Sequence, residues 1–342
     1  MTPMAAPAGI PKEDADWARR SIERHLGAAR LSIDVEAIPS RLATVHRITV
    51  QTADGTRRFY LKRYPADVLA GDFTHRADDL SSLARAVRGA GLLPFAVVAA
   101  EPARRLLLAE ETKGSPLGHL HRRLVWSPAA RAAALAAWQG VGAWLAVLHR
   151  QSIAPKPSPT RAAELVSYTN ARFEMWGAEE PASAQLAQRA AETVQRMGAA
   201  LEGRGVTLTP CHGDVTTFNI LVGKAGVGLI DLDDFRFDMP AIDISQALLE
   251  LDQFSRFGGV ASLARFRARA RARLEHGYGH PFPQGSEFWL PHFRNLSVFI
   301  LTLARRRTGV TISRLSNAAH YARLRAELAR SLEQASREGG GA

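Results

Sequence analysis

Apolar and polar positions in the first third of the chain predict a small sheet with flanking helices. Apolar residues recur at helical spacing near the N-terminus, and residues that alternate in the manner of strands follow them. Asp54-Gly55 is a strong turn signal between two of these strands. The expected elements are a helix at 14–26, three strands within 31–64, a helix at 75–88, and strands at 95–99 and 106–109.

The later part of the chain has a mainly helical pattern. Apolar stripes with a period near 3.6 residues recur there, and a Pro-rich break interrupts them at 155–159. An arginine-rich stretch also has such a stripe, formed by Leu263, Phe266, Ala270 and Leu274. The other expected helices cover 129–149, two segments of 162–200 divided near Pro181, 288–303 and 321–337.

One stretch of the later part concentrates polar chemistry. Two apolar runs, 220–222 and 227–230, are separated by a Gly-containing turn and predict a β-hairpin. Asp214 and Asn219 precede this hairpin, and Asp231 follows it directly. The hairpin is therefore expected to hold two carboxylates and a carboxamide near one of its ends. Such hard oxygen ligands suit Mg²⁺ better than Zn²⁺.

The polar residues of this stretch form a recognisable series. The sequence reads H-G-D-V-T-T-F-N from His212 to Asn219, and Leu229-Ile230-Asp231 follows the hairpin. This series resembles the catalytic segment of the aminoglycoside phosphotransferase and choline kinase-like family, whose relatives, the protein kinases, use a similar layout. The resemblance covers roughly residues 33–250. It implies a bilobal, protein-kinase-like α+β fold with a small antiparallel-sheet N-lobe and a mainly helical C-lobe.

The resemblance also implies roles for the matching residues. Asp214 would orient or deprotonate the acceptor hydroxyl, and Asn219 and Asp231 would hold Mg²⁺ against the phosphates of ATP. His212 would have a structural role within the loop. Asp243, at the start of the next helix, would brace the loop by accepting backbone hydrogen bonds. The implied enzyme is a kinase, a phosphotransferase that uses an alcohol group as the acceptor.

The expected N-lobe contains the other residues that the resemblance implies for nucleotide binding. Lys62 lies in the third strand, where the family has the lysine that binds the ATP phosphates. The acid expected to pair with this lysine is Asp79, with Asp78 as the alternative, where the family usually has Glu. Glu110 and Glu111 end the strand before the expected hinge, at which adenine is bound through backbone groups.

The expected N-lobe departs from the family pattern at two places. The loop at 39–44 has no glycine, so the Gly-rich cover over the phosphates is missing. Tyr60 stands where a small residue usually covers adenine. Because alternate residues of a strand share a face, Tyr60 and Lys62 are expected on one face, with Phe59 and Leu61 on the other. These departures keep a non-catalytic, kinase-like nucleotide-binding module open as an alternative.

Length and composition set the expected organisation of the chain. Its 342 residues are enough for two lobes, and an apolar content of 46% is ordinary for a globular core. The expected parts are a disordered N-terminus at 1–11, a nucleotide-binding N-lobe at 12–112, a helical C-lobe with the catalytic loop and acceptor site at 113–335, and a flexible tail at 336–342.

Targeting signals and disulfides are not expected. Cys211 is the single cysteine, so no intrachain disulfide can form. Residues 1–11 lack the basic-then-apolar layout of a signal peptide, and no apolar run is expected to reach the roughly 18 residues of a transmembrane span. These features favour a cytoplasmic location.

Charge bears on the expected partners. The net charge is +11. One interpretation is GC-rich codon use, and the other is a function that depends on attraction to anions, including peripheral contact with anionic surfaces. The sequence contains no nucleic-acid-binding motif, so no nucleic-acid partner is expected. The expected partners are a nucleotide and a small-molecule hydroxyl substrate.

The class of acceptor stays open at this point. An Arg-rich C-lobe argues mildly against cationic aminoglycosides, although Glu250 and Asp252 could line a local acidic pocket. A lipopolysaccharide-core or other sugar or glycolipid kinase is the alternative. Residues 59–64 (F-Y-L-K-R-Y) and 230–236 (I-D-L-D-D-F-R) resemble segments of that group.

Overall fold

The chain folds into two compact units. The computed structural model describes residues 9–27, 32–38, 43–65, 73–93, 95–151, 156–253, 261–306 and 312–339. Unit 1 comprises Met1–Ser115 and Leu221–Asp233, and unit 2 comprises Pro116–Ile220 and Asp234–Ala342. The predicted boundary between an N-lobe at 12–112 and a C-lobe at 113–335 stays a prediction.

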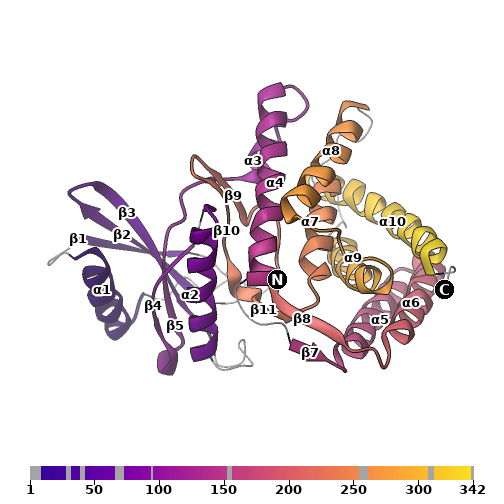
Figure 1. The fold of residues 1–342 in the computed structure, drawn as a ribbon, viewed down its shortest axis with the longest axis horizontal. Coiled ribbons are helices and arrows are strands. Elements are labelled where there is room, and N and C mark those ends of the chain that lie inside the picture. The colour runs from indigo at the N-terminus through magenta and orange to yellow at the C-terminus, as the bar shows by residue number, and fades with distance from the viewer. Residues whose placement is uncertain are drawn as a thin grey trace. The chain divides into compact units, whose positions relative to one another are not determined.

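Unit 1 contains a five-stranded sheet in which every pairing is antiparallel. Its strands follow the order β1-β2-β3-β5-β4 (Figure 1). The turn predicted at Asp54-Gly55 joins β2 to β3, and Gly55 has a φ of 116°, which favours glycine. The strands are β1 (Ser32–Ile38), β2 (Thr44–Thr52), β3 (Gly55–Arg63), β4 (Ala96–Glu101) and β5 (Leu106–Glu110).

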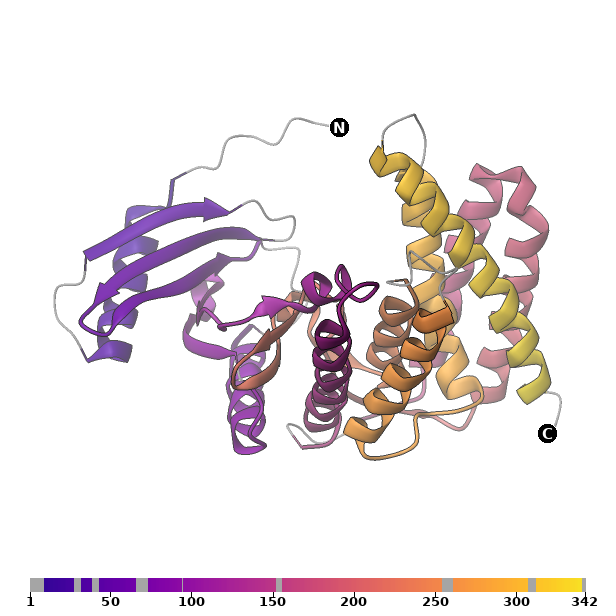
Figure 2. The ribbon, with the colours of Figure 1, turned by 90° about the horizontal axis from the view of Figure 1, so that it is seen from above.

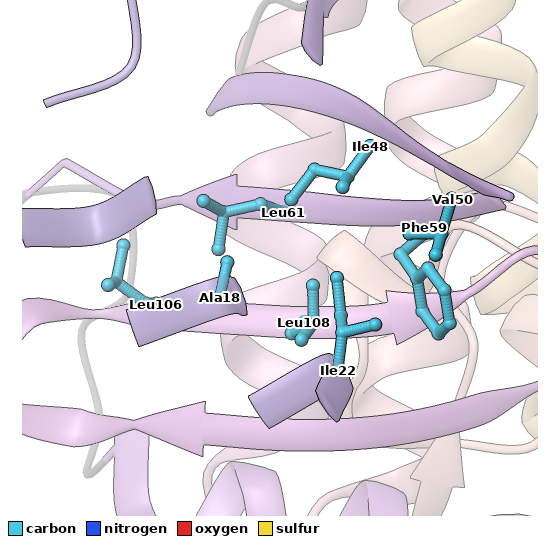
Figure 3. Close-up of a cluster of buried hydrophobic side chains, with 8 residues drawn as sticks. All are labelled: Ala18, Ile22, Ile48, Val50, Phe59, Leu61, Leu106 and Leu108. Atoms are coloured by element: carbon cyan, nitrogen blue, oxygen red, sulfur yellow. The ribbon is translucent and has the colours of Figure 1, made fainter. Parts of the chain in front are cut away.

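One face of this sheet is covered by helix α1 (Lys12–Leu26). Figure 3 shows Phe59 and Leu61 of β3 in a buried cluster with Ala18 and Ile22 of α1. Strand alternation then directs Tyr60 and Lys62 to the opposite face, as the sequence predicts. Burial of the aliphatic and aromatic side chains stabilises the pairing of helix and sheet, since each large side chain contributes about 1.5–3 kcal/mol.

The predicted hairpin is present and packs within unit 1. It consists of β9 (Ile220–Gly223) and β10 (Gly226–Leu229), and β6 (Ser115–Pro116) is the third strand of this small sheet. Its glycines allow close backbone approach, because a Cβ on Gly223 would lie 2.7 Å from the carbonyl oxygen of Lys113. The amide of Leu93 donates a hydrogen bond of 3.2 Å to the carbonyl of Val227. These contacts fix the strand that leads into Asp231.

Helix α2 (Phe73–Gly89) completes the described part of unit 1 and packs against β4. Its apolar stripe, formed by Leu80, Leu83 and Val87, is buried. Residues 1–8 and 39–42, which include most of the glycine-free loop and of the predicted disordered N-terminus, lie outside the described residues.

Unit 2 is mainly helical, as predicted, and also has a three-stranded sheet of order β11-β8-β7. Figure 2 shows its long helices side by side. The strands are β7 (Lys156–Ser158), β8 (Val206–Cys211) and β11 (Arg236–Asp238). The helices are α3 (Leu117–His121), α4 (Pro128–Gln151), α5 (Arg161–Glu179), α6 (Ala184–Leu201), α7 (Ala241–Gln253), α8 (Ala261–Tyr278), α9 (Ser286–Arg306) and α10 (Ile312–Gly339).

The helical pattern is therefore confirmed in detail. The predicted division near Pro181 appears as a short 3₁₀ turn between α5 and α6. The stripe Leu263, Phe266, Ala270 and Leu274 is buried on α8. Helix α10 continues to Gly339, so the described part of the predicted flexible tail, residues 336–339, is helical. The predicted fold class, α+β with a small antiparallel sheet and a mainly helical remainder, is confirmed.

Helix α4 bears on the expectation that the chain has no transmembrane span. Its segment Pro128–Arg150 is long and apolar enough, by length and composition alone, to cross a membrane, and it is the one such helix among the described residues. This is weak evidence for a span, because 61% of the window is buried inside the structure, and the core helix of a soluble protein meets the same criterion.

Two glycines bring α4 and α8 unusually close together (Figure 1, Figure 2). A Cβ on Gly142 of α4 would overlap the carbonyl oxygen of Leu274, and a Cβ on Gly277 of α8 would overlap that of Gln139. The overlapping atoms belong to the backbone, so they cannot move aside as a flexible side chain would. The pair therefore sets the separation between the two helices.

We predict that Gly142→Ala lowers the free energy of unfolding by about 1–3 kcal/mol, because the added methyl forces α4 and α8 apart. Thermal unfolding followed by circular dichroism measures the effect. Gly89→Ala is the matched control, since a Cβ there meets nothing within 4 Å. An unchanged melting temperature in Gly142→Ala would show that the helices tolerate a wider separation.

Candidate active site

The loop that follows β8 is held by a buried carboxylate of α7. Asp243 Oδ2 accepts a hydrogen bond of 2.7 Å from the backbone N–H of His212, and Oδ1 accepts one of 2.8 Å from Gly213. Asp243 is fully buried. The bracing contact predicted for Asp243 is confirmed by these two bonds.

Asp243 has a buried partner on its other side. His149 Nε2 lies 3.2 Å from Asp243 Oδ2, and its Nδ1 lies 3.0 Å from the hydroxyl of Tyr278. Burial alone would raise the pKa of Asp243. The hydrogen bond and the charge of His149, the charge of His212 and the hydrogen bond from the Gly213 amide outweigh burial and hold that pKa below its ordinary value of 3.8. His149, at the end of α4, is thus a buried residue that links Asp243 to Tyr278.

Backbone geometry requires glycine at position 213. Gly213 has a φ of 83°, and a Cβ there would lie 2.5 Å from the carbonyl oxygen of Asp234. The ring of His212 accepts a hydrogen bond of 3.2 Å from the Asp214 amide through Nδ1. Gly213 and the hydrogen bond to His212 thereby fix the backbone conformation of the loop directly before Asp214.

Two side-chain amides hold the carboxylate of Asp214. Asn219 Nδ2 donates to Asp214 Oδ2 at 2.8 Å and to the Asp214 backbone carbonyl at 3.0 Å. Gln246 Nε2 donates to Asp214 Oδ1 at 3.1 Å. Both donors are neutral, so they orient the carboxylate without cancelling its charge. The bond from Asn219 joins two residues that the sequence singles out.

Gln246 is not among the residues that the sequence motif predicts. It lies three residues after Asp243 on α7, and Glu250 follows four residues later, so the three share a helical face. Glu250 Oε2 accepts hydrogen bonds of 3.0 Å from both the backbone amide and the hydroxyl of Thr217. The polar spacing at 243, 246 and 250 within an apolar helix is the signal that could have identified this face.

In unit 1, Lys62 bonds to two acids next to the hairpin. Its Nζ donates to Asp231 Oδ1 at 2.5 Å and to Asp233 Oδ1 at 2.7 Å. The hydroxyl of Tyr64 also donates to Asp233 Oδ1 at 2.7 Å. Burial tends to lower the pKa of Lys62, but Asp233 and Asp231 outweigh it, so the pKa lies above the ordinary lysine value. Asp233 is therefore a further member of this cluster.

Asp231 occupies an uncommon backbone conformation. Its φ is 63°, in the left-handed region that few residues other than glycine adopt. Its side chain is 45% exposed, whereas that of Lys62 is 18% exposed. The Asp231 side chain is thus partly accessible to solvent while it binds the lysine.

Three other residues of unit 1 are predicted to serve the nucleotide: Glu110, Glu111 and Asp79. Glu110 binds the guanidinium of Arg57, with Nε at 2.8 Å, and lies 3.2 Å from His25 Nε2. Glu111 accepts a hydrogen bond of 3.3 Å from the hydroxyl of Tyr60. Asp79, on α2, is partly buried, and its pairing with Lys62 stays a prediction.

The donor set of the predicted metal residues fits a hard cation. Asn219 uses its Nδ2 for both hydrogen bonds to Asp214, which leaves Oδ1 as the atom that could ligate a cation. The oxygens of Asp231 and Asp233 already hold a cation, the ammonium group of Lys62. Carboxylate and carboxamide oxygens of this kind suit Mg²⁺.

A second group of metal-ligand residue types has another explanation. His149, Cys211 and Asp243 are buried with their ligand atoms within 4.8 Å of one another. The thiol of Cys211, however, donates to the carbonyl of Asp238 at 3.4 Å, and burial raises the pKa of Cys211 well above its ordinary value. A protonated thiol and a carboxylate engaged with the loop amides make this group a structural core.

We predict that Asp243→Asn lowers the free energy of unfolding by about 3 kcal/mol at pH 7, because a carboxamide cannot serve both loop amides and His149. Since the folded-state pKa of Asp243 is depressed, the stabilisation exists above its ordinary pKa of 3.8 and is lost as the pH falls through the folded value. The difference in melting temperature from wild type should thus be constant between about pH 5 and 7 and shrink in stronger acid.

The control for this prediction is Glu202→Gln, which makes the same carboxyl-to-amide change at an exposed position of unit 2. It should leave the melting temperature unchanged across the same pH range. If Asp243→Asn behaved like this control, the two loop amides would not depend on the carboxylate.

Comparison with solved structures shows the fold. The chain is similar to a choline/ethanolamine kinase family protein from Mesorhizobium loti, with 14% identity and a TM-score of 0.52 over 95% of this chain and 99% of that one. It is also similar to a glucosamine kinase, with 15% identity and a TM-score of 0.58 over 94% of this chain and 84% of that one. A spectinomycin phosphotransferase in complex with ADP and spectinomycin is similar with 13% identity and a TM-score of 0.51, over 92% of this chain and 98% of that one.

Comparison of sequences identifies the family. No curated protein sequence matches the chain significantly. The sequence model of the phosphotransferase enzyme family, in contrast, matches residues 38–289, which is more than half of the chain and includes Lys62, the H-G-D loop and Asp231. The family predicted from the sequence is thereby confirmed, and the chain belongs to the phosphotransferase enzyme family.

Proposed function

We propose that this enzyme transfers the γ-phosphate of ATP, with Mg²⁺, to a hydroxyl group of a small molecule. The observation that carries the proposal is the setting of Asp214. Its carboxylate accepts hydrogen bonds from Asn219 and Gln246, on a loop whose preceding amides are bound by Asp243. Family membership supports the reaction class.

Asp214 has the properties needed to act on the acceptor. Neutral amide donors at 2.8 and 3.1 Å fix both carboxylate oxygens and leave the negative charge in place. A carboxylate held in this way can orient the acceptor hydroxyl and receive its proton during transfer. Fixed orientation matters because phosphoryl transfer depends mainly on positioning and on charge stabilisation.

Lys62, Asp231 and Asn219 would serve the nucleotide. Lys62 would bind the phosphates, and its two carboxylate partners keep it protonated and directed before the nucleotide arrives. Asp231 and the Oδ1 atom of Asn219 would hold Mg²⁺. When bound, Mg²⁺ supplies positive charge that offsets the charge of the phosphate oxygens.

The predicted alternatives differ in their support. A sugar or glycolipid kinase would use the same transfer chemistry, so Asp214 and Lys62 do not distinguish it. A non-catalytic binding module would have no need for an oriented Asp214. The amides of Asn219 and Gln246 on that carboxylate therefore favour an enzyme.

We predict that Asp231→Ala reduces turnover by at least about 10³-fold, because it removes a charged ligand of the metal. Calorimetric titration with ADP should show that wild-type affinity rises with Mg²⁺, whereas the variant loses this dependence. Asp54→Ala, at the exposed β2–β3 turn, is the control and should retain it. Wild-type turnover in Asp231→Ala would contradict the assignment.

We predict that Asp214→Asn lowers kcat by about 10²–10⁴-fold and leaves Mg·ADP affinity unchanged, because it removes the proton acceptor and not a nucleotide contact. Transfer of label from γ-labelled ATP to a fractionated metabolite and lipid extract measures the first effect, and calorimetry the second. If Mg·ADP affinity fell in parallel with turnover, Asp214 would serve the nucleotide instead of the acceptor.

A further inference from the structure

Four arginines of unit 2 gather around one buried carboxylate and one tyrosine ring. Arg161 and Arg172 come from α5, Arg236 from β11 and Arg294 from α9. Helices α5 and α9 pack against each other in this unit (Figure 2). We call Arg172, Arg236 and Arg294 the arginine cluster.

Asp238 is already fully used by two of the four arginines. It is completely buried, and Arg161 binds it in a bidentate manner, with Nε at 3.0 Å from Oδ1 and Nη2 at 2.7 Å from Oδ2. Arg236 Nε donates to Oδ2 at 3.0 Å, and the Met239 amide donates to Oδ1 at 2.9 Å. Its single negative charge therefore offsets one of the two guanidinium charges, and Arg161 has Glu164 as a second acid at 2.8 Å.

The other two arginines stack on a shared tyrosine ring. The guanidinium carbon of Arg172 lies 3.4 Å from the centroid of the Tyr168 ring, and that of Arg294 lies 5.3 Å from it. Arg294 donates to Asn295 Oδ1 at 2.8 Å, and Arg172 donates to the backbone carbonyl of Tyr168 at 3.3 Å. Within the described residues, these partners are neutral and no carboxylate forms an ion pair with either arginine.

The arginines of the cluster act on one another. Burial lowers the pKa of Arg294, and the charges of Arg236 and Arg172 lower it further, while Tyr168 and Asp238 oppose the change only in part. A partly buried guanidinium without a carboxylate is costly, and an anion bound there would offset the cost. Planar guanidinium groups bind phosphate and carboxylate oxygens with two parallel hydrogen bonds.

One member of the arginine cluster, Arg236, lies beside the loop that contains Asp214. Arg236 Nη1 donates to the Asp234 carbonyl at 3.1 Å, and a Cβ on Gly213 would lie 2.6 Å from the same nitrogen. Gly213 directly precedes Asp214. Tyr168 is 37% exposed, so the residue on which the two guanidinium groups stack lies at the surface of unit 2.

We propose that Arg172, Arg236 and Arg294 bind an anionic group, a phosphate or a carboxylate, that the hydroxyl acceptor itself carries. This inference rests on the proposed function and narrows its acceptor to anionic compounds. An amine-bearing acceptor would meet repulsion from the cluster, and Glu250, which the sequence suggested for an acidic pocket, is engaged by Thr217. The arginine cluster binds the anionic group of the acceptor, and Asp214 orients the hydroxyl group of the same compound.

The first test measures anion binding without catalysis. The probe is inorganic phosphate, titrated at constant ionic strength into protein whose nucleotide site is saturated with Mg·ADP, and the side-chain Nε–H signals of arginine are followed by NMR. Wild type should bind phosphate, and Arg294→Gln should weaken binding about tenfold or more, since one charge-assisted contact is lost. Arg172→Gln, which removes the other guanidinium group on the Tyr168 ring, should weaken phosphate binding in the same direction and serves if Arg294→Gln does not fold.

The control variant is Arg269→Gln, which removes a guanidinium from the exposed face of α8. It should bind phosphate as wild type does. If phosphate failed to bind, or if binding were the same in wild type, Arg172→Gln and Arg294→Gln, the inference would be wrong, whatever the outcome for nucleotide binding.

The second test separates this inference from the proposed function. Acceptors are offered in pairs that share a hydroxyl framework, such as glucose with glucose 6-phosphate and glycerol with glycerate, beside choline and glucosamine, in the presence of γ-labelled ATP. The inference is supported if phosphate is transferred to the anionic member of a pair, and if Arg294→Gln raises the KM for that compound about tenfold while kcat changes little. Transfer only to neutral or cationic compounds overturns the inference and leaves the kinase function intact.

The source of the anion is resolved with a cell extract. After incubation with γ-labelled ATP, the products are divided between aqueous and organic phases. Label in the aqueous phase that falls in Arg294→Gln indicates a soluble phosphate or carboxylate, and label in the organic phase that falls in the same variant indicates a lipid headgroup. Label that moves equally in wild type and Arg294→Gln in both phases contradicts a role for the cluster.

Discussion

The candidate site of unit 2 depends on the buried carboxylate of Asp243. A buried charge is stable only when hydrogen bonds replace its hydration, and here two loop amides and His149 supply them. The same bonds hold the amides of His212 and Gly213, which a tight turn would otherwise leave unpaired. The carboxylate and the loop therefore stabilise each other, and the conformation of the backbone before Asp214 follows from this exchange.

Helix α7 extends this constraint along the loop. Its polar positions 243, 246 and 250 contact, in order, the amides before Asp214, the Asp214 carboxylate and Thr217. One rigid helix thus positions three successive parts of the loop. Because the residues that hold the loop lie on a helix, they limit the displacement of Asp214, which suits a reaction that depends on orientation.

Charge is distributed differently in the two units. In unit 1, two carboxylates surround one lysine, so the local excess is negative and suits a metal cation. In unit 2, the arginine cluster has more guanidinium groups than acids, and the local excess is positive.

The sequence alone determined the features that depend on neighbouring residues. Periodicity predicted the helices and the hairpin, alternation separated Lys62 from Phe59, and the spacing from Asp214 to Asn219 identified a pair that is hydrogen-bonded in the structure. Only the tertiary structure decided the long-range contacts: the acids that bind Lys62, the amide of Gln246 on Asp214, and the arginines around Tyr168. These contacts join residues from different elements, and local sequence pattern carries no information about which helix faces will meet until packing brings them together.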